Sequence, residues 1–454
     1  MVLTGDQLEV IKQEASEHFW PHSRQSNDMF GENGLTMVEK SNGVWVDDTD
    51  GNRWFDTISS MWLVNIGHGR KEIADAVYSQ MTKISYSPGG TVTPVTAELS
   101  SRVAKLSPDK KSRIYFVSGG SEAVETALKM AKQYQRNIGE SNRWKIISRR
   151  GSYHGATHAC MSLGGGSIAS PELYGPLMPG NIHIEQPDSY RGRCCSAKGG
   201  CTLECAKDLE RAILHEGAST VAAFIGEPIS AAAGIHIPHP DYWPTIRAIC
   251  DKYGVLLICD EVINAFGRTG KMFASEHWNI IPDITTVAKA LTSGYLPIGA
   301  AIASQKISQA FELNDDSTFR HLITFGGNPA SCAAAIENLN IMESDNLVRN
   351  SEIMGEHLLE KLQQLKDHDI VGDIRGGKGL LCAVELVKNP ISKEKFPKNV
   401  NLSQKLTKIA KHHHILGRLG DVIPIAPPLC ITIDEIDYFV EQLDQTITEF
   451  EETL

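Results

Sequence analysis

Residues 255–270 read VLLICDEVINAFGRTG and contain the pattern that decides the fold. An unbroken apolar run leads to Asp260, and it resumes after Glu261 with Val262 and Ile263. A short apolar run of this kind is typical of a strand that is buried on both faces of a parallel sheet. A buried carboxylate at the end of such a strand is costly unless it meets a cation or hydrogen-bond donors. We therefore expect a central strand whose carboxyl end carries a functional aspartate.

A lysine follows the next apolar run along the chain, which contains Ile284, Val287 and Ala288. Burial lowers the pKa of a lysine, and Lys289 would then be a nucleophile able to form a Schiff base with a carbonyl. The alternative is a lysine that extends its ammonium to solvent. The stretch GYLPIG at 294–299 favours a fixed loop around a buried amine instead.

A glycine pair stands between a predicted strand over 113–118 and a predicted helix that Gly139 can end. Gly119 and Gly120 allow an anion to approach the backbone, and the helix start offers free N–H groups. Ser121 can add a hydroxyl, which makes this segment a candidate phosphate site. The alternative is a tight turn in which Ser121 is the N-cap. The chain has no GxxxxGK[ST] loop, which argues against a nucleoside triphosphate.

Strands and helices alternate from about residue 67 to residue 325, which predicts an α/β fold with a mostly parallel sheet covered on both faces. Ligands bind beyond the carboxyl ends of the strands of such sheets. Ser121, Glu227, Asp260 and Lys289 all follow predicted strands, so we expect them to gather at one edge. The predicted strands are 113–118, 145–148, 221–226, 255–263, 283–288 and 298–304.

A smaller α+β domain is predicted from the two ends of the chain. Residues 43–58 resemble a hairpin, in which Asp50 and Gly51 suit a type I′ turn. Near the C-terminus, helical patterns cover 347–365, 402–412 and 436–450, and 372–386 is glycine-rich and strand-like. We expect residues 1–66 to join the small domain, 67–328 to form the large domain and 329–454 to form the rest of the small domain.

Composition narrows the class of protein. The chain has 454 residues, with 44 Lys plus Arg against 55 Asp plus Glu, and a net charge of −11. An acidic chain is a poor candidate for nucleic-acid binding, and we expect no such partner. No apolar run approaches the length of a membrane span, and the polar N-terminus does not resemble a secretory signal. We therefore expect a cytoplasmic protein without a membrane partner.

Four of the ten cysteines cluster in a polar loop, at Cys194, Cys195, Cys201 and Cys205. Their spacing lacks the paired C-x-x-C knuckles of common zinc sites, so the sequence favours a chain without metal while leaving a zinc site open. The remaining cysteines that lie in apolar stretches suit a reducing compartment.

A phosphate cradle, a buried acid for a pyridinium nitrogen and a buried lysine are together the contacts that pyridoxal 5′-phosphate needs. With these residues in place, the chain resembles the class III pyridoxal-phosphate aminotransferases from about residue 18 to residue 450. The resemblance rests on FVSGGSEA at 116–123, GSYHG at 151–155, GEP at 226–228, DEVINAFGRTG at 260–270, KAL at 289–291 and TFGGNP at 324–329.

The resemblance implies a fold type I transferase with a seven-stranded sheet, and it assigns roles to individual residues. Lys289 would bind the cofactor covalently and carry the proton, and Asp260 would pair with the ring nitrogen. Val262 and Tyr153 would enclose the ring, with Glu227 beside it. Gly120 and Ser121 would hold the phosphate, and Thr324 would reach the phosphate in the neighbouring subunit. Gly119 stands where the family usually has serine, so one phosphate hydroxyl is missing.

Further motifs are similar to the omega-amino acid and amine:pyruvate subgroup. MWL at 61–63 places Trp62 in the substrate pocket, with His22 where an aromatic residue is usual. LGRLGD at 416–421 implies that Arg418 binds the carboxylate of the acceptor. We expect a roomy donor pocket beside Trp62, unless Tyr86 or a partner residue closes it.

The subgroup implies a transaminase that moves the amino group of a primary amine or omega-amino acid to a keto acid such as pyruvate. It also implies a homodimer with shared sites, or a tetramer. An aminomutase or a decarboxylase that uses the same cofactor is the alternative. The sequence does not fix the donor, for which β-alanine, taurine, a diamine and a larger amine are candidates.

Overall fold

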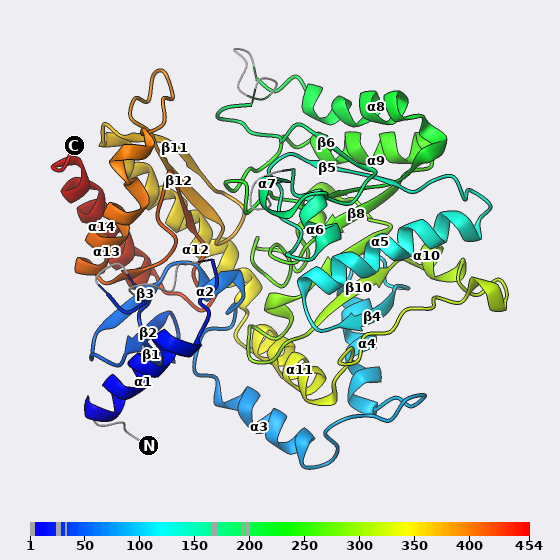
Figure 1. Ribbon diagram of the computed structural model, residues 1–454, viewed down its shortest axis with the longest axis horizontal. Coiled ribbons are helices and arrows are strands. Elements are labelled where there is room, and N and C mark those ends of the chain that lie inside the picture. The colour runs from blue at the N-terminus through cyan, green and yellow to red at the C-terminus, as the bar shows by residue number, and fades with distance from the viewer. Residues whose placement is uncertain (1–4, 24–28, 32–33, 166–170, 193–194, 196–199) are drawn as a thin grey trace.

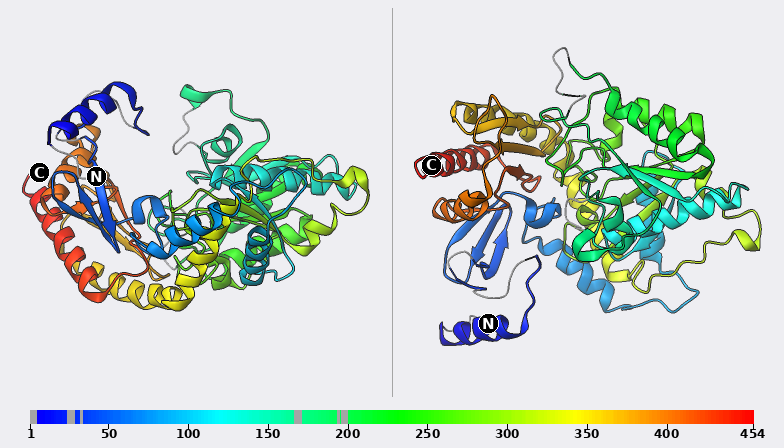
Figure 2. Two further views of the ribbon diagram at one scale, coloured as in Figure 1. Left: turned by 90° about the horizontal axis from the view of Figure 1, so that it is seen from below. Right: turned by 45° about the horizontal axis from the view of Figure 1, so that its top comes forward.

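The chain folds into a large lobe built on one extended sheet and a small lobe formed from both ends of the sequence (Figure 1). The computed structural model describes residues 5–23, 29–31, 34–165, 171–192, 195 and 200–454. Helix α1 (Gly5–His18) buries none of its side chains and lies on the side of the small lobe, where Lys12 pairs with Asp50 at 3.4 Å (Figure 2).

The large lobe contains a seven-stranded sheet in the order β4-β10-β9-β8-β7-β5-β6. Strand β10 runs antiparallel to both of its neighbours, and the other neighbouring pairs are parallel. The predicted α/β class with a mostly parallel sheet is therefore confirmed. The strands are β4 (Arg113–Val117), β5 (Lys145–Arg149), β6 (Asn181–Ile184), β7 (Val221–Gly226), β8 (Leu256–Asp260), β9 (Ile284–Val287) and β10 (Gly299–Ala303).

Two separate apolar layers cover this sheet, because alternate residues of each central strand point to opposite faces. Leu257 and Cys259 pack with α8 and α9, whereas Leu256 and Ile258 pack with α5, α6 and α10. The sheet is thus sealed on both faces, and its carboxyl edge is left for a site. These helices are α5 (Gly120–Asn137), α6 (His158–Leu163), α8 (Glu204–Glu216), α9 (Tyr242–Tyr253) and α10 (Gln305–Gln309).

In the small lobe, segments from both ends of the chain share one sheet. Strand β3 pairs in parallel with β13, which lies far along the chain, and β1 and β2 complete the layer. A second, antiparallel sheet contains β11, β12 and β14. The strands are β1 (Val38–Asn42), β2 (Trp45–Asp48), β3 (Arg53–Asp56), β11 (Val371–Arg375), β12 (Cys382–Leu386), β13 (Ile415–Leu416) and β14 (Val422–Ile425).

The longer helices outside the large sheet share one apolar cluster with the strands of the small lobe. Helix α11 packs against α3 and α4, and α12 and α13 both pack against α14. The domain limits at residues 66 and 328 stay a prediction. These helices are α3 (Lys71–Met81), α4 (Pro94–Leu106), α11 (Pro329–Ser344), α12 (Leu347–Leu362), α13 (Leu402–His412) and α14 (Ile433–Glu451).

Two local predictions are wrong, and one of the alternatives left open by the sequence is excluded. The β2–β3 hairpin is present, but only Gly51 of its predicted turn pair has a positive φ, so the turn is not type I′. Helix α5 begins at Gly120 with Gly119 as its N-cap, so Ser121 lies inside the first turn and is not the cap. Strand β8 ends at Asp260, before the predicted end at residue 263.

The search for membrane spans covers the described residues, and none of their helices combines the length and apolar character that a bilayer crossing requires.

Candidate active site

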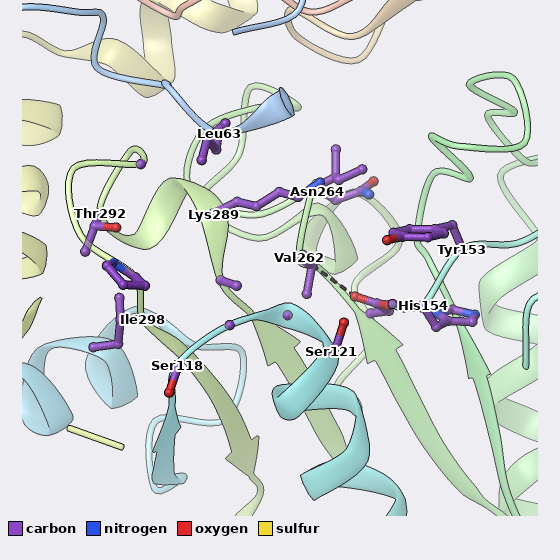
Figure 3. Close-up of a pocket in the computed structure, with 18 of the residues that line it drawn as sticks. Leu63, Ser118, Ser121, Tyr153, His154, Val262, Asn264, Lys289, Thr292 and Ile298 are labelled. Atoms are coloured by element: carbon purple, nitrogen blue, oxygen red, sulfur yellow. Dashed lines mark hydrogen bonds and ion pairs between the residues drawn. The ribbon is translucent and has the colours of Figure 1, made fainter. Parts of the chain in front are cut away.

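A cavity of about 370 Å³ lies at the carboxyl edge of the large sheet. Its walls come from the segments that follow β4, β5, β7, β8 and β9, as parallel strands require. Figure 3 shows Lys289 reaching across the cavity above Val262, while Ser118 and Ser121 lie on the opposite side. Most of the predicted cofactor contacts line it, namely Gly120, Ser121, Tyr153, Glu227, Asp260, Val262 and Lys289.

The base of the cavity is the start of helix α5, whose first backbone N–H groups have no partner within the helix. Gly120 faces Val262 so closely that a Cβ at residue 120 would lie 3.0 Å from Val262 Cγ1. The backbone at Gly155 approaches Ser121 even more closely, and the N–H of Ala156 donates to Ser121 Oγ over 3.0 Å. The turn thus offers a bare, electropositive surface that fits a phosphate group.

Asp260 is buried, and each of its carboxylate oxygens is held by neighbours. Oδ1 accepts hydrogen bonds from the N–H of Val262 at 3.1 Å and from the hydroxyl of Thr286 at 3.0 Å. Oδ2 lies 2.6 Å from Nδ1 of His154, which is itself buried. These contacts fix the carboxylate at the cavity wall, where a protonated ring nitrogen would complete its partners. The hydrogen bond from the N–H of Val262 to Asp260 also holds Val262 at the cavity.

Lys289 lies directly after β9 in a left-handed backbone conformation, with φ of 42°. Burial lowers the pKa of its amine to about 8, and the negative charges of Asp260 and Glu227 partly oppose that shift. The amine lies 5.6 Å from the ring centre of Trp62. A lysine with this pKa is a competent nucleophile toward an aldehyde near neutral pH, as the sequence predicts.

Glu227 closes the side of the cavity next to Asp260. One carboxylate oxygen accepts from the N–H of Tyr153 at 3.2 Å, and the other accepts from the hydroxyl of Ser230 at 2.5 Å. The guanidinium of Arg149, fully buried behind it, lies 3.9 Å away. Burial raises the pKa of Glu227 despite these partners and the nearby His154.

These residues fit pyridoxal 5′-phosphate. The cavity is of the size that encloses a small cofactor. It provides a site for an anion at Gly120, which a larger side chain would fill. The carboxylate of Asp260 and the buried amine of Lys289 line the same cavity. Those are the three contacts expected from the sequence.

A wider groove of about 1820 Å³ opens from this cavity toward the small lobe. Tyr153 and Lys289 line both spaces, and Trp62, His22 and Arg418 line the groove. All predicted substrate residues therefore border one continuous space. Arg418 is exposed on the loop after β13, and among the described residues it has no ion-pair partner. Tyr86 does not line the groove.

The loop that carries Trp62 is unusually constrained. Ser59, Ser60 and Trp62 all have positive φ, a conformation that non-glycine residues rarely adopt. Trp62 is buried, and its indole N–H has no hydrogen-bond partner among the described residues. Such strain persists only where the surroundings enforce it, and it is typical of functional sites.

Arg268, in the predicted aspartate motif, supplies that constraint. Its guanidinium is fully buried and donates to Ser59 Oγ at 2.9 Å and to Asn65 Oδ1 at 2.7 Å. It also donates to the carbonyls of Leu380 and Pro427 in the small lobe. Burial lowers the pKa of Arg268 to about 9. The residue thus ties the tryptophan loop to both lobes.

Thr324 is the predicted cofactor contact that lies outside the cavity. It is exposed, and its carbonyl accepts a hydrogen bond from the hydroxyl of Tyr86 at 2.5 Å. The contact of Thr324 with the cofactor phosphate of a neighbouring subunit therefore stays a prediction.

The sequence did not point to His154, Thr286 or Arg268 individually, although His154 lies in the quoted GSYHG motif. His154 and Asp260 are far apart in the chain. They come together because β5 and β8 lie on either side of β7 in the sheet. The sequence offered one signal for this contact: His154 follows a predicted strand, as Asp260 does, and both are therefore expected at the same edge of the sheet.

Known enzymes of one family resemble this chain over most of its length. The aminotransferase class-III family matches residues 29–447. The putrescine–pyruvate aminotransferase of Pseudomonas aeruginosa is 36% identical over 91% of this chain and 92% of its own length. The taurine–pyruvate aminotransferase of Bilophila wadsworthia is 36% identical over 99% of both chains.

A solved structure resembles the whole molecule. An amine transaminase from an uncultivated Pseudomonas species, in its pyridoxal-phosphate-bound form, superposes with a TM-score of 0.90. It is 34% identical and covers 95% of this chain and 98% of its own. This chain therefore belongs to the class-III aminotransferase family, and its cofactor is pyridoxal 5′-phosphate.

Proposed function

We propose that the protein transfers the amino group of a primary amine or omega-amino acid to pyruvate, giving an aldehyde or ketone and alanine. The observation that carries this proposal is the groove that joins Lys289 and Trp62 to an arginine without an ion-pair partner among the described residues. Arg418 can bind a carboxylate through two parallel hydrogen bonds. The pyruvate-dependent activities named for the two relatives support the same acceptor.

The chemistry divides between cofactor and protein. When bound, pyridoxal 5′-phosphate supplies the electron sink that stabilises negative charge at the carbon bearing the amine. Asp260 keeps the ring nitrogen protonated, and the start of α5 binds the phosphate. Lys289 moves the proton at the reacting carbon, a task suited to an amine whose pKa lies near 8. Trp62 covers that amine and excludes water from it.

Arg418→Ala tests the acceptor assignment. We expect the KM for pyruvate to rise about tenfold or more, because a charge-assisted pair is worth roughly 1.5–3 kcal/mol. The KM for an uncharged amine donor should change little. Steady-state kinetics with a panel of amines, read as alanine formed, measures both values, and Arg418→Lys is the matched control for charge without the bidentate geometry.

An equal rise in the KM for pyruvate and in the KM for the amine would show that Arg418 has a structural role. The proposal of pyruvate as the acceptor would then lose its support. Turnover of an amine without any keto acid would instead favour an aminomutase or a decarboxylase.

We infer that the enzyme works as a homodimer. Around Thr324, the side chains of Leu322 and Phe325 are 83% and 61% exposed, and the ring of Phe325 contacts that of Tyr86. Adjacent exposed apolar residues of this kind mark interaction surfaces. A second copy on this surface would bring Thr324 toward the neighbouring cofactor. We also infer a cytoplasmic location, which the nine free thiols among the described residues support.

A further inference from the structure

Three cysteine thiols converge in the large lobe, away from the active site. Cys205 lies in the first turn of α8 and is buried, and Cys195 and Cys201 lie in the segment that leads to this helix. Cys195 Sγ is 3.4 Å from Cys205 Sγ and 3.6 Å from Cys201 Sγ. All three sulfur atoms lie within 4.8 Å of one another. Helix α8 borders the sheet next to β6 (Figure 1).

This arrangement suits a metal better than a disulfide. A disulfide needs two sulfurs about 2.05 Å apart, and each of the three possible pairings would leave the third thiol beside the bond. Thiolates that bind one zinc ion at about 2.3 Å with tetrahedral angles lie about 3.8 Å apart. The observed separations are close to that value, and three sulfurs facing one point are what a metal requires.

Backbone groups beside the three sulfurs also suit a metal site. The N–H of Leu203 donates to Cys201 Sγ over 3.4 Å, and backbone donors of this kind commonly support the sulfur ligands of a metal. Cys205 stands at the positive end of the α8 dipole, which stabilises a thiolate. A cation at this point would neutralise the mutual repulsion of three adjacent thiolates.

We propose that Cys195, Cys201 and Cys205 bind one Zn²⁺ ion. Binding replaces the three thiol protons, which are released to solvent, and forms three zinc–sulfur bonds. Among the described residues no other His, Cys, Asp or Glu joins the group. The sequence spacing argued against a metal because it lacks paired knuckles. The fold nevertheless brings the three sulfurs together, because two of the ligands lie in a loop and the third lies at the start of a helix.

The ion has a structural task at the junction of the lobes. Just before Cys195, Arg191 donates to Glu385 Oε1 on β12 at 2.6 Å and to the carbonyl of Lys393. Lys393 in turn donates to the carbonyl of Tyr190 at 2.5 Å. The segment is therefore attached to the small lobe at one end. The zinc site would attach Cys195 and Cys201 to the first turn of α8.

Metal analysis of the purified holoenzyme tests the proposal, with zinc in the growth medium and no chelator in the buffers. We expect about one zinc per chain in the native protein, in line with a single thiolate site. Cys201→Ser and Cys205→Ser should each lose most of it. Cys430→Ser is the matched control, because Cys430 is a half-buried cysteine outside the cluster, and it should retain the metal.

Two further measurements keep the test independent of folding and of transamination. Replacing zinc by Co²⁺ should produce thiolate-to-cobalt charge-transfer absorption in the native protein and not in Cys201→Ser. A chelator should lower the melting temperature of the native holoenzyme by several degrees at unchanged cofactor content, and leave that of Cys201→Ser unchanged.

Three results would overturn the zinc site. One is a native protein without bound metal after growth in zinc. Another is equal zinc in the native protein and both cysteine variants, which would make the metal adventitious. The third is a gain of two titratable thiols on reduction of the unfolded protein, which would identify a disulfide instead.

Discussion

At the scale of single residues, the amine of Lys289 combines two opposing influences. Burial lowers its pKa, and the carboxylates of Asp260 and Glu227 raise it, with burial dominant and a result of about 8. The amine is therefore mostly protonated at pH 7 and mostly neutral above pH 8. That balance allows one group to act as a nucleophile and as a proton carrier in the same site.

This balance predicts how the apoenzyme takes up its cofactor. The rate of covalent capture should rise about tenfold per pH unit below pH 8 and level off above it, because the neutral amine is the reactive form. Stopped-flow absorbance of the forming Schiff base measures this rate. Glu227→Gln removes a charge that raises the pKa of Lys289 and should move the curve to lower pH. If the midpoint of the rate–pH curve lay near pH 10.5, the amine of Lys289 would be solvated and the prediction would fail.

The glycine pair gives a second prediction at this scale. Gly119 has extended backbone angles, with φ of −174° and ψ of −178°, and a Cβ there would meet nothing within 4 Å. Serine can therefore occupy residue 119 without strain and restore the missing phosphate hydroxyl. We expect Gly119→Ser to tighten cofactor binding about five- to tenfold, as one added hydrogen bond to a charged group allows.

Gly120→Ser is the matched control, because a side chain there would be pressed against Val262. It should weaken cofactor binding, measured for both variants by fluorescence titration of the apoenzyme. Unchanged binding in Gly119→Ser would show that the phosphate lies away from residue 119.

At the scale of elements, the sequence predicted the strands that carry the site because their patterns are local. Asp260 and Lys289 each end an apolar run, and a run of that kind identifies a buried strand without knowledge of its neighbours. The polar strand β6 was not predicted, since NIHI offers too short a pattern. The contact between His154 and Asp260 was also missed, because it depends on the order of strands in the sheet.

The tryptophan loop illustrates the same limit. Nothing in the residues SSMW suggests three positive φ angles, because that conformation is imposed from outside the loop. Arg268 enforces it through Ser59 and Asn65. The resemblance to the family therefore predicts Trp62 in the pocket, but not the strained backbone that holds it there.

Arg268→Lys should release this loop. A shorter ammonium cannot reach four acceptors, so some buried oxygens lose their partner at a cost of about 2–4 kcal/mol in the free energy of unfolding. We expect a lower melting temperature together with a lower kcat. The control is Arg150→Lys, since Arg150 is exposed and pairs only weakly with Glu185. A stability loss with unchanged kcat would mean that Trp62 is positioned by other contacts.

At the scale of the whole molecule, the candidate site is built from both lobes. The sheet edge supplies the cofactor contacts, the small lobe supplies Arg418, and the exposed Thr324 lies outside the cavity of its own chain. The apolar side chains beside Thr324 are the surface that a second copy would cover. In the proposed homodimer, assembly and catalysis would be coupled, because each chain would complete the phosphate site of the other.

Subunit complementation distinguishes this coupling from a site within one chain. Lys289→Ala lacks the amine, and Thr324→Ala should bind the cofactor weakly and have little activity when the cofactor is limiting. In a hybrid dimer of the two variants, one site combines an intact Lys289 with the intact Thr324 of the other chain. Mixing the unfolded variants and refolding them together should therefore restore about one active site per hybrid dimer. If Thr324 acts within its own chain, no combination of the two variants contains a complete site, and the mixture stays as inactive as its components.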